Sequence, residues 1–262
     1  MDKEKYNAKV VEKTVLQPGI ISIVLNVGDV ISQAVPGQFI DLYSKDKSRM
    51  LPRPISICDV DSEAQTMRIV FRIAGAGTEE FSNLEAGDTV EIVGPLGGGY
   101  KFNTEGVHIL LGGGIGIPPM LYLAKTLNLS GVPKENIKVV LGFRDKDTFL
   151  VEDFEKYSTV YITSDDGSIG IKGTVIDGLK EYDITGDMIY ACGPTPMLKG
   201  VSAYSFEKKI KAQISLEERM ACGVGACLAC VTKCHKVDDH SKVNNKRICK
   251  DGPVFDAEEV EL

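Results

Sequence analysis

The stretch HILLGGGIGIPPMLYLA, from His108 to Ala124, has the pattern of a buried strand, a glycine-rich turn and a helix. Glycines let a backbone approach phosphates, and a helix N-terminus favours anionic groups. The stretch does not match G-x-G-x-x-G, because Ile117 stands where the last glycine would fall. A dinucleotide-binding turn and an ordinary tight strand–helix turn both remain open at this point.

The sequence on either side of this stretch predicts the domain organisation. Short β-rich runs separated by Gly, Pro, Asp or Ser precede it, which is typical of a small antiparallel barrel. From Val107 onward, apolar strands alternate with helical patterns, as in βαβ units. The end of the chain is rich in Cys and Gly. The sequence therefore predicts a multi-domain β plus α/β protein, with a barrel over residues 1–102, a Rossmann-like parallel domain over 103–210 and a small domain over 211–262.

Composition excludes some classes of partner. The net charge is −7 and no basic block stands out, which argues against a nucleic-acid partner. The first residues, MDKEKYNAKV, have no apolar core of the kind found in secretory signals. The longest apolar tract contains glycines and two adjacent prolines, which a membrane helix rarely tolerates. We expect a soluble cytoplasmic protein.

Five of the seven cysteines lie close together, in CGVGACLACVTKC from Cys222 to Cys234 and at Cys249. The spacing of Cys222, Cys227, Cys230 and Cys249 is C-x4-C-x2-C followed by a distant cysteine, the order of plant-type [2Fe–2S] proteins. In a reducing compartment, clustered cysteines indicate metal or redox chemistry more often than disulfides. These four cysteines are therefore the predicted ligands of a [2Fe–2S] cluster.

The alternative metal is structural zinc, bound by some of these cysteines with His235 or His240. Zinc sites commonly show two short Cys or His pairs, and a four-residue gap followed at once by a two-residue gap fits that pattern poorly. Cys234 is a competing fourth ligand, since a three-residue gap follows Cys230. We favour Cys249, which supplies a distant segment to close the site, and leave Cys234 as a bystander.

Two further motifs lie in the barrel region, and the first of them is expected at the end of a β run. RPISIC runs from Arg53 to Cys58. The guanidinium of Arg53 is always charged and can form a bidentate contact with a pyrophosphate, and Ser56 can hydrogen-bond a ring nitrogen. GAGTEEF, from Gly75 to Phe81, can start a helix and hold a phosphate. Taken singly, each motif is also consistent with an ordinary turn.

The order of the motifs is more specific than any one of them. RPIS, the two glycine-rich turns and CGPTPM, from Cys192 to Met197, together resemble the ferredoxin–NADP reductase superfamily over about residues 5–205. With SDDGSIGIKG from Ser164, EERMACGVGACLACV from Glu217 and ICKDGPVF from Ile248, the chain resembles the iron–sulfur electron-transfer subunits of NAD-linked (type B) dihydroorotate dehydrogenases.

The resemblance implies which residues bind the cofactors. Arg53 would lie on the FAD pyrophosphate and Ser56 near the reactive edge of the flavin, with Ile55 where the superfamily often has Tyr. The residues implied for FAD are Arg53, Pro54, Ile55, Ser56, Val70, Phe71, Arg72, Gly77 and Thr78. Those implied for the nicotinamide dinucleotide are Gly114, Gly116, Pro118, Cys192, Gly193 and Pro194, and the charges of Asp165 and Asp166 make these two residues further candidates.

The resemblance also implies the function. Dihydroorotate would reduce the FMN of a catalytic partner subunit, and this chain would pass the electrons through [2Fe–2S] and FAD to NAD+ in pyrimidine biosynthesis. A heterotetramer with two copies of each chain is expected, and no catalytic acid–base residue is predicted in this one. Two alternatives stay open: the small subunit of an NADH-dependent ferredoxin:NADP oxidoreductase or sulfide dehydrogenase, and a zinc-bearing structural protein. Labile sulfide and a flavin spectrum would exclude the latter.

The preference for NAD over NADP follows from charge. NADP-using relatives tend to carry a basic residue after the third strand of the dinucleotide domain, whereas this chain has Asp165 and Asp166. Carboxylates at this position repel a 2′-phosphate and can accept a hydrogen bond from a ribose hydroxyl. A solvated acidic turn without a binding role would have the same sequence.

Replacing both aspartates with asparagine should narrow the preference for NAD. The measurement is the ratio of kcat/KM for NAD to that for NADP, and an unchanged ratio would contradict the assignment.

Overall fold

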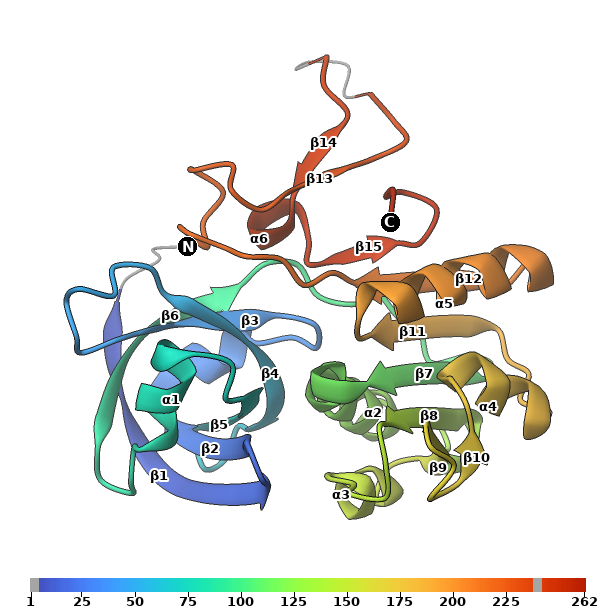
Figure 1. The fold of residues 1–262 in the computed structure, drawn as a ribbon, viewed down its shortest axis with the longest axis horizontal. Helices are drawn as coiled ribbons and strands as arrows, with labels where there is room; N and C mark the ends of the chain where they lie inside the picture. Colours follow the sequence, from blue (N-terminus) through green and yellow to red (C-terminus); the bar gives the residue numbers. More distant parts are fainter. Residues whose placement is uncertain (1–4, 238–241) are drawn as a thin grey trace.

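The computed structural model describes residues 5–237 and 242–262, and places a β-barrel beside an α/β sheet, with a small cysteine-bearing unit above both (Figure 1). Antiparallel strands close the barrel in the order β1-β2-β5-β4-β3-β6. They are β1 (Tyr6–Gln17), β2 (Ile20–Asn26), β3 (Phe39–Tyr43), β4 (Arg53–Asp61), β5 (Thr66–Arg72) and β6 (Thr89–Leu96). A 3-10 helix, η1 (Gly28–Gln33), and helix α1 (Ala76–Ser82) connect them.

The barrel interior is filled by aliphatic side chains from successive strands. Ile23, Leu25, Ile57, Met67 and Ile69 are all fully buried. In β5 the alternation of inward and outward side chains places Arg68 between Met67 and Ile69, as expected for a strand with one face in a core. The predicted antiparallel barrel is confirmed.

One sequence expectation about the barrel was wrong. RPIS was expected at the end of a β run, but Arg53 is the first residue of β4 and pairs with Leu42 of β3. The preceding loop, residues 44–52, leads directly to Arg53, so the motif lies at the mouth of the barrel.

The second unit is a sheet with the strand order β10-β9-β8-β7-β11-β12-β15. All of its neighbouring strands run parallel except β15, which is antiparallel to β12. The strands are β7 (His108–Gly113), β8 (Ile137–Phe143), β9 (Thr159–Ser164), β10 (Ile171–Lys172), β11 (Met188–Cys192), β12 (Lys211–Ser215) and β15 (Val254–Asp256). The helices are η2 (Gly114–Gly116), α2 (Ile117–Leu129), η3 (Lys134–Asn136), α3 (Val151–Glu155), α4 (Val175–Glu181) and α5 (Thr195–Lys208).

Helices cover both faces of this sheet. Ile109 and Leu111 of β7 face a core that includes side chains of α4 and α5, whereas Leu110 between them faces a core with α2 and α3. Every residue of β7 is buried, as in a central parallel strand. Two prolines in the first turn of α2 are favourable there, because the first N–H groups of a helix have no partner within it.

The chain order creates a switch point in the sheet. After β7 the chain adds β8 and β9 on one side, and later adds β11 on the other side of β7. Loops leaving β7 and β11 therefore diverge at their carboxyl ends, where open α/β sheets bind ligands.

The cysteine-bearing unit consists of β13 (Val231–Lys233), β14 (Asn245–Arg247), helix α6 (Ile248–Asp251) and the loop before β13. The sheet of the second unit continues past the predicted boundary between residues 210 and 211, because β12 and β15 both belong to it. The division into 103–210 and 211–262 is a proposal based on sequence. In space, the 211–262 segment contributes two strands to the neighbouring sheet.

Polar contacts join the barrel to the α/β unit. Lys125 of α2 contacts Asp59 of β4 at 2.8 Å and also donates to the Val60 carbonyl at 2.8 Å. Arg68 of β5 contacts Asp153 of α3 at 2.8 Å. Both ion pairs are partly buried, so solvent screens them less than surface pairs. Among the described residues, no helix is long and apolar enough to span a membrane.

Candidate functional site

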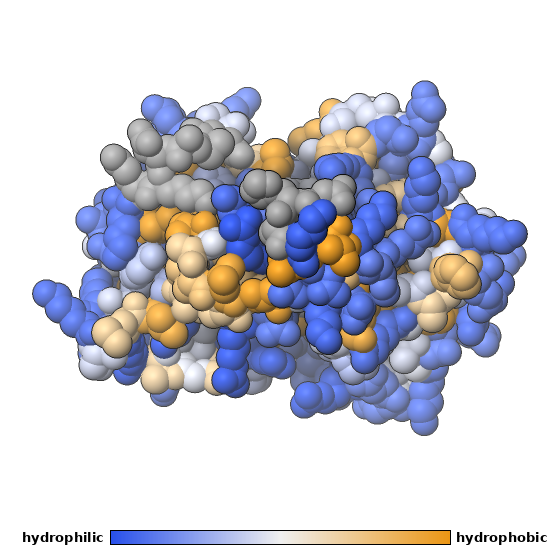
Figure 2. All heavy atoms as spheres, turned by 90° about the horizontal axis from the view of Figure 1, so that it is seen from above, coloured by the Kyte–Doolittle hydropathy of each residue, from blue (hydrophilic) through white to orange (hydrophobic). Residues whose placement is uncertain are grey.

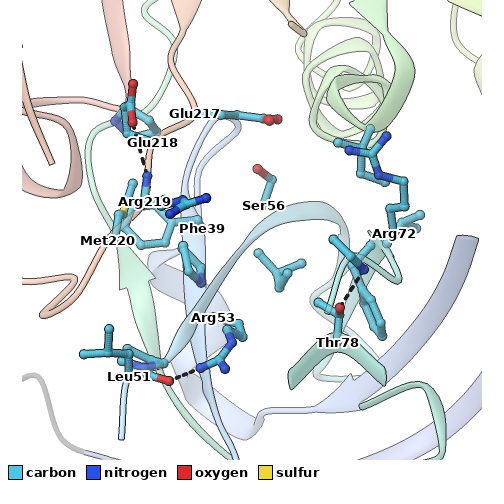
Figure 3. Close-up of a pocket in the computed structure, with 18 of the residues that line it drawn as sticks. Phe39, Leu51, Arg53, Ser56, Arg72, Thr78, Glu217, Glu218, Arg219 and Met220 are labelled. Atoms are coloured by element: carbon cyan, nitrogen blue, oxygen red, sulfur yellow. Dashed lines mark hydrogen bonds between the residues drawn. The ribbon is translucent and has the colours of Figure 1, made fainter. Parts of the chain in front are cut away.

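A cavity of about 1050 Å³ opens where the barrel, the β7–α2 turn and the segment after β12 meet (Figure 3). This volume is at the upper end of the range for small-molecule sites, about 300–1000 Å³. Eight of the nine residues expected to bind FAD line it: Arg53, Pro54, Ile55, Ser56, Val70, Phe71, Arg72 and Thr78. The structure thus brings two motifs that are separate in sequence into one wall.

Gly77, the ninth residue, lies directly against the Arg53 guanidinium. A Cβ at Gly77 would lie 2.8 Å from Cζ of Arg53, so the close approach requires glycine. The Arg53 guanidinium also donates to the carbonyl of Leu51. Thr78 holds the turn before α1, because its hydroxyl accepts hydrogen bonds from the N–H groups of Ala74 and Gly75. These contacts fix the Arg53 head group at the cavity wall.

The segment after β12 supplies the opposite wall. All residues from Ser215 to Met220 line the cavity, and Figure 3 shows Glu217 and Arg219 on the side of Ser56. Sequence reasoning did not assign these residues to the flavin site. The signal available was only an acidic and basic run, EER, directly ahead of the cysteine motif.

Glu217 connects the cavity to the end of β11. Its Oε1 lies 4.0 Å from Sγ of Cys192. Glu217 faces the open cavity, yet the surrounding protein desolvates its carboxyl and raises the pKa, while Arg72 acts in the opposite direction. Burial likewise raises the pKa of the Cys192 thiol far above its usual value, so Cys192 is a neutral thiol.

The two turns expected to bind the nicotinamide dinucleotide contact each other. A Cβ at Gly116 would lie 2.5 Å from the backbone nitrogen of Gly193, so the turn after β7 packs directly on the turn after β11. Cys192 pairs with Gly112 in the sheet, which holds both turns at the same edge. Ile115, between Gly114 and Gly116, lines the flavin cavity. The dinucleotide turns and the cavity are therefore adjacent.

Asp165 and Asp166 follow β9 at the same edge of the sheet. The N–H of Asp165 donates to the Phe143 carbonyl at 3.1 Å, which continues the pairing of β9 with β8. Asp166 accepts a hydrogen bond from the Ser168 N–H at 2.9 Å, and its hydrogen bonds to Ser168 lower the pKa of the carboxyl. Asp166 is therefore an anion at neutral pH, as the charge argument requires.

The four predicted cluster ligands form two pairs. The N–H of Cys227 donates to Sγ of Cys222 at 3.4 Å, and the N–H of Cys249 donates to Sγ of Cys230 at 3.4 Å. Among residues 5–237 and 242–262, no three His, Cys, Asp or Glu side chains meet as they would around a single ion. Two pairs suit a cluster with two irons, because each iron takes two protein ligands.

The cysteine loop is held between the barrel and α6. Gly223 and Gly225 have φ of +63° and +83°, a left-handed conformation that favours glycine. A Cβ at Gly223 would overlap the buried carboxylate of Asp41 in β3, and one at Gly225 would lie 2.7 Å from Cδ of Lys250. The loop therefore packs on the barrel at one glycine and on the segment that carries Cys249 at the other.

The thiols differ in their surroundings. Desolvation raises the pKa of Cys222, but hydrogen bonds from backbone N–H groups, first that of Cys227, outweigh it and bring the pKa to about 6. Desolvation and the neighbouring Cys230 raise the pKa of Cys249 to about 12. Metal binding requires thiolates, and N–H groups aimed at Sγ stabilise them. The donor set fits an iron–sulfur cluster.

Cys234 lies apart from both pairs. Its Sγ donates to the carbonyl of Lys236 at 3.2 Å, and its backbone bridges Val260 near the C-terminus. His235, a candidate in the zinc alternative, is exposed beside Glu261. His240 lies outside the described residues.

Comparisons with known proteins agree with this geometry. Residues 217–261 match the family described as the iron–sulfur cluster binding domain of dihydroorotate dehydrogenase B. The electron transfer subunit of dihydroorotate dehydrogenase B (NAD(+)) from Listeria monocytogenes is 43% identical over 97% of this chain and 98% of the relative. The corresponding subunit from Streptococcus mutans is 43% identical over 98% of each chain. The solved structure of an NADH-dependent reduced ferredoxin-NADP oxidoreductase, studied for flavin-based electron bifurcation, superposes with a TM-score of 0.86 at 32% identity, over 97% of this chain and 89% of that one.

These relatives confirm the predicted fold class and oxidoreductase function, and they support FAD, an iron–sulfur cluster and NAD as cofactors. The chain belongs to the family of electron transfer subunits of NAD-linked dihydroorotate dehydrogenase B.

Proposed function

We propose that this chain transfers electrons from the FMN of a catalytic dihydroorotate dehydrogenase subunit to NAD+, in the cytoplasm and in pyrimidine biosynthesis. When bound, FAD exchanges two electrons with a nicotinamide and single electrons with a one-electron carrier such as a [2Fe–2S] cluster. One observation carries the proposal. Met220 lines the flavin cavity and Cys222 follows two residues later, so the two cofactor sites share one continuous segment.

The cavity walls have separate tasks in this proposal. Arg53, fixed by Gly77 and Leu51, would bind the FAD pyrophosphate as a charge-assisted fork. Ser56, on the side of Glu217, would hydrogen-bond the reactive edge of the ring. The aliphatic and aromatic residues Ile55, Val70 and Phe71 would pack on the flavin and exclude water. Pro54, Arg72 and Thr78 are the other cavity-lining residues proposed to bind FAD.

NAD would bind across the switch point of the sheet. The contacting turns at Gly114, Gly116 and Pro118 and at Cys192, Gly193 and Pro194 would hold the nicotinamide half against the cavity. Asp165 and Asp166 would accept hydrogen bonds from the adenosine ribose.

The cluster site has one exposed and one buried half. Cys227 and Leu228 are exposed and Cys222 is half-buried, whereas Cys230 and Cys249 are buried. The exposed half is suited to face the catalytic partner, with two copies of each chain in the assembly. The bifurcating oxidoreductase remains a second candidate, because its solved structure covers almost all of this chain.

Reconstitution tests the proposal and separates the candidates. The purified chain, mixed with an FMN-containing dihydroorotate dehydrogenase subunit, should reduce NAD+ in the presence of dihydroorotate, and neither protein alone should do so. Stimulation only by a large multi-cluster flavoprotein would favour the bifurcating enzyme and contradict the proposal.

The contact between Gly77 and Arg53 predicts a specific defect. Gly77→Ala should weaken FAD binding about 10- to 100-fold, because the new Cβ would displace the flexible Arg53 guanidinium and a charge-assisted hydrogen bond is worth about 1.5–3 kcal/mol. Gly75→Ala is the matched control, since Gly75 has extended backbone and open space at its Cβ. The measurement is the FAD dissociation constant of the apoprotein. Equal FAD affinities in the two variants would contradict the proposed contact between Arg53 and FAD.

The cysteine pairs predict which thiols bind the cluster. Cys249→Ala should abolish the visible absorption of the cluster, because it breaks the buried pair with Cys230, whereas Cys234→Ala should keep it. The reverse result would show that the loop supplies all four thiolates.

A further inference from the structure

Arg219 lies in the wall that joins the two cofactor sites. It belongs to the cavity-lining segment Ser215–Met220 and precedes Cys222 by three residues. Figure 3 shows its side chain reaching into the cavity on the side of Phe39 and Ser56, with Arg53 and Thr78 at the opposite end. A cation therefore stands at the end of the cavity away from the proposed pyrophosphate site.

The other arginines of the cavity have identifiable roles or partners. Arg49 contacts Glu80 at 2.9 Å and Asp46 at 3.3 Å. Arg53 is fixed by Leu51 and Gly77, and Arg72 acts electrostatically on Glu217. The guanidinium of Arg219 makes no hydrogen bond or ion pair with any residue in the described part of the chain, whereas its backbone N–H donates to Glu218 at 3.4 Å.

An unpaired guanidinium aimed into a ligand cavity is a ready hydrogen-bond donor to the carbonyl oxygens and ring nitrogens of a flavin. Flavin reduction places negative charge on the pyrimidine part of the ring, and nearby protein charge tunes its potential. A cation there stabilises the reduced form more than the oxidised form, because the attraction grows with the charge that it faces.

We propose that Arg219 contacts the isoalloxazine ring of FAD and raises its reduction potential, so that the segment leading to the cluster also tunes the flavin. This inference rests on the proposed function. It assigns to Arg219 a positioning and electrostatic role that the motifs at Arg53 and Gly77 do not supply.

The test is the midpoint potential of FAD bound to the intact chain, measured by equilibration with NADH and NAD+ and followed by flavin absorption. Arg219→Gln should require about a tenfold higher NADH to NAD+ ratio for half-reduction, equivalent to about 30 mV for a two-electron couple. Arg219→Lys should recover more than half of the shift, because it keeps the charge.

Arg49→Gln is the matched comparison, since it removes the same group from the same cavity. Its charge is already balanced by Glu80 and Asp46, so its shift should be much smaller. Release of FAD by Arg219→Gln, but not by Arg49→Gln, would also support direct contact.

Other results would overturn the inference. An Arg219→Gln potential equal to that of the unmodified chain, with FAD still bound, would show that Arg219 does not contact the ring. A raised KM for NADH with an unchanged potential would place Arg219 in the dinucleotide site. Absence of flavin binding by the unmodified chain would instead contradict the proposed function itself.

Discussion

A short segment, residues 216–221, joins the last parallel strand to the first cysteine of the loop, and both proposed cofactor sites depend on its course. Its start is fixed by the pairing of β12 with β11 and β15. Its end is fixed by the contact of Gly223 with Asp41 of the barrel. Between these anchors, residues 216–220 line the cavity and form one of its walls. The cluster loop and the flavin cavity are thus held together by chain connectivity as well as by packing.

The contacts between the barrel and the α/β unit supply the remaining constraint. Partly buried ion pairs at Lys125 and Arg68 link strands of the barrel to helices of the sheet. Pairs of this kind contribute modest free energy, since desolvation offsets much of their attraction. Their directionality nevertheless specifies how the two units meet. Transfer between a flavin and a nicotinamide requires such specification, because misplacement by about 1 Å is costly to rate.

Local sequence patterns predicted the parts of the site that are local. The strand, turn and helix around Gly114 follow from periodicity, and the cysteine spacing predicted the ligand types. The sequence did not reveal the pairing of β12 with β15, because these strands are separated by the whole cysteine region. Glu217 and Arg219 look like ordinary solvated charges in a one-dimensional pattern. Only the tertiary path of their segment turns them toward the cavity.

In the proposed function, one chain holds both a two-electron and a one-electron carrier. An anaerobic reductive titration of the purified, fully loaded chain tests it directly, with flavin absorption and the electron paramagnetic resonance of the cluster as readouts. A chain that holds both carriers should take up about three electrons, about two for FAD and about one for the cluster. An uptake of only about two electrons, with no paramagnetic signal from a reduced cluster, would contradict it.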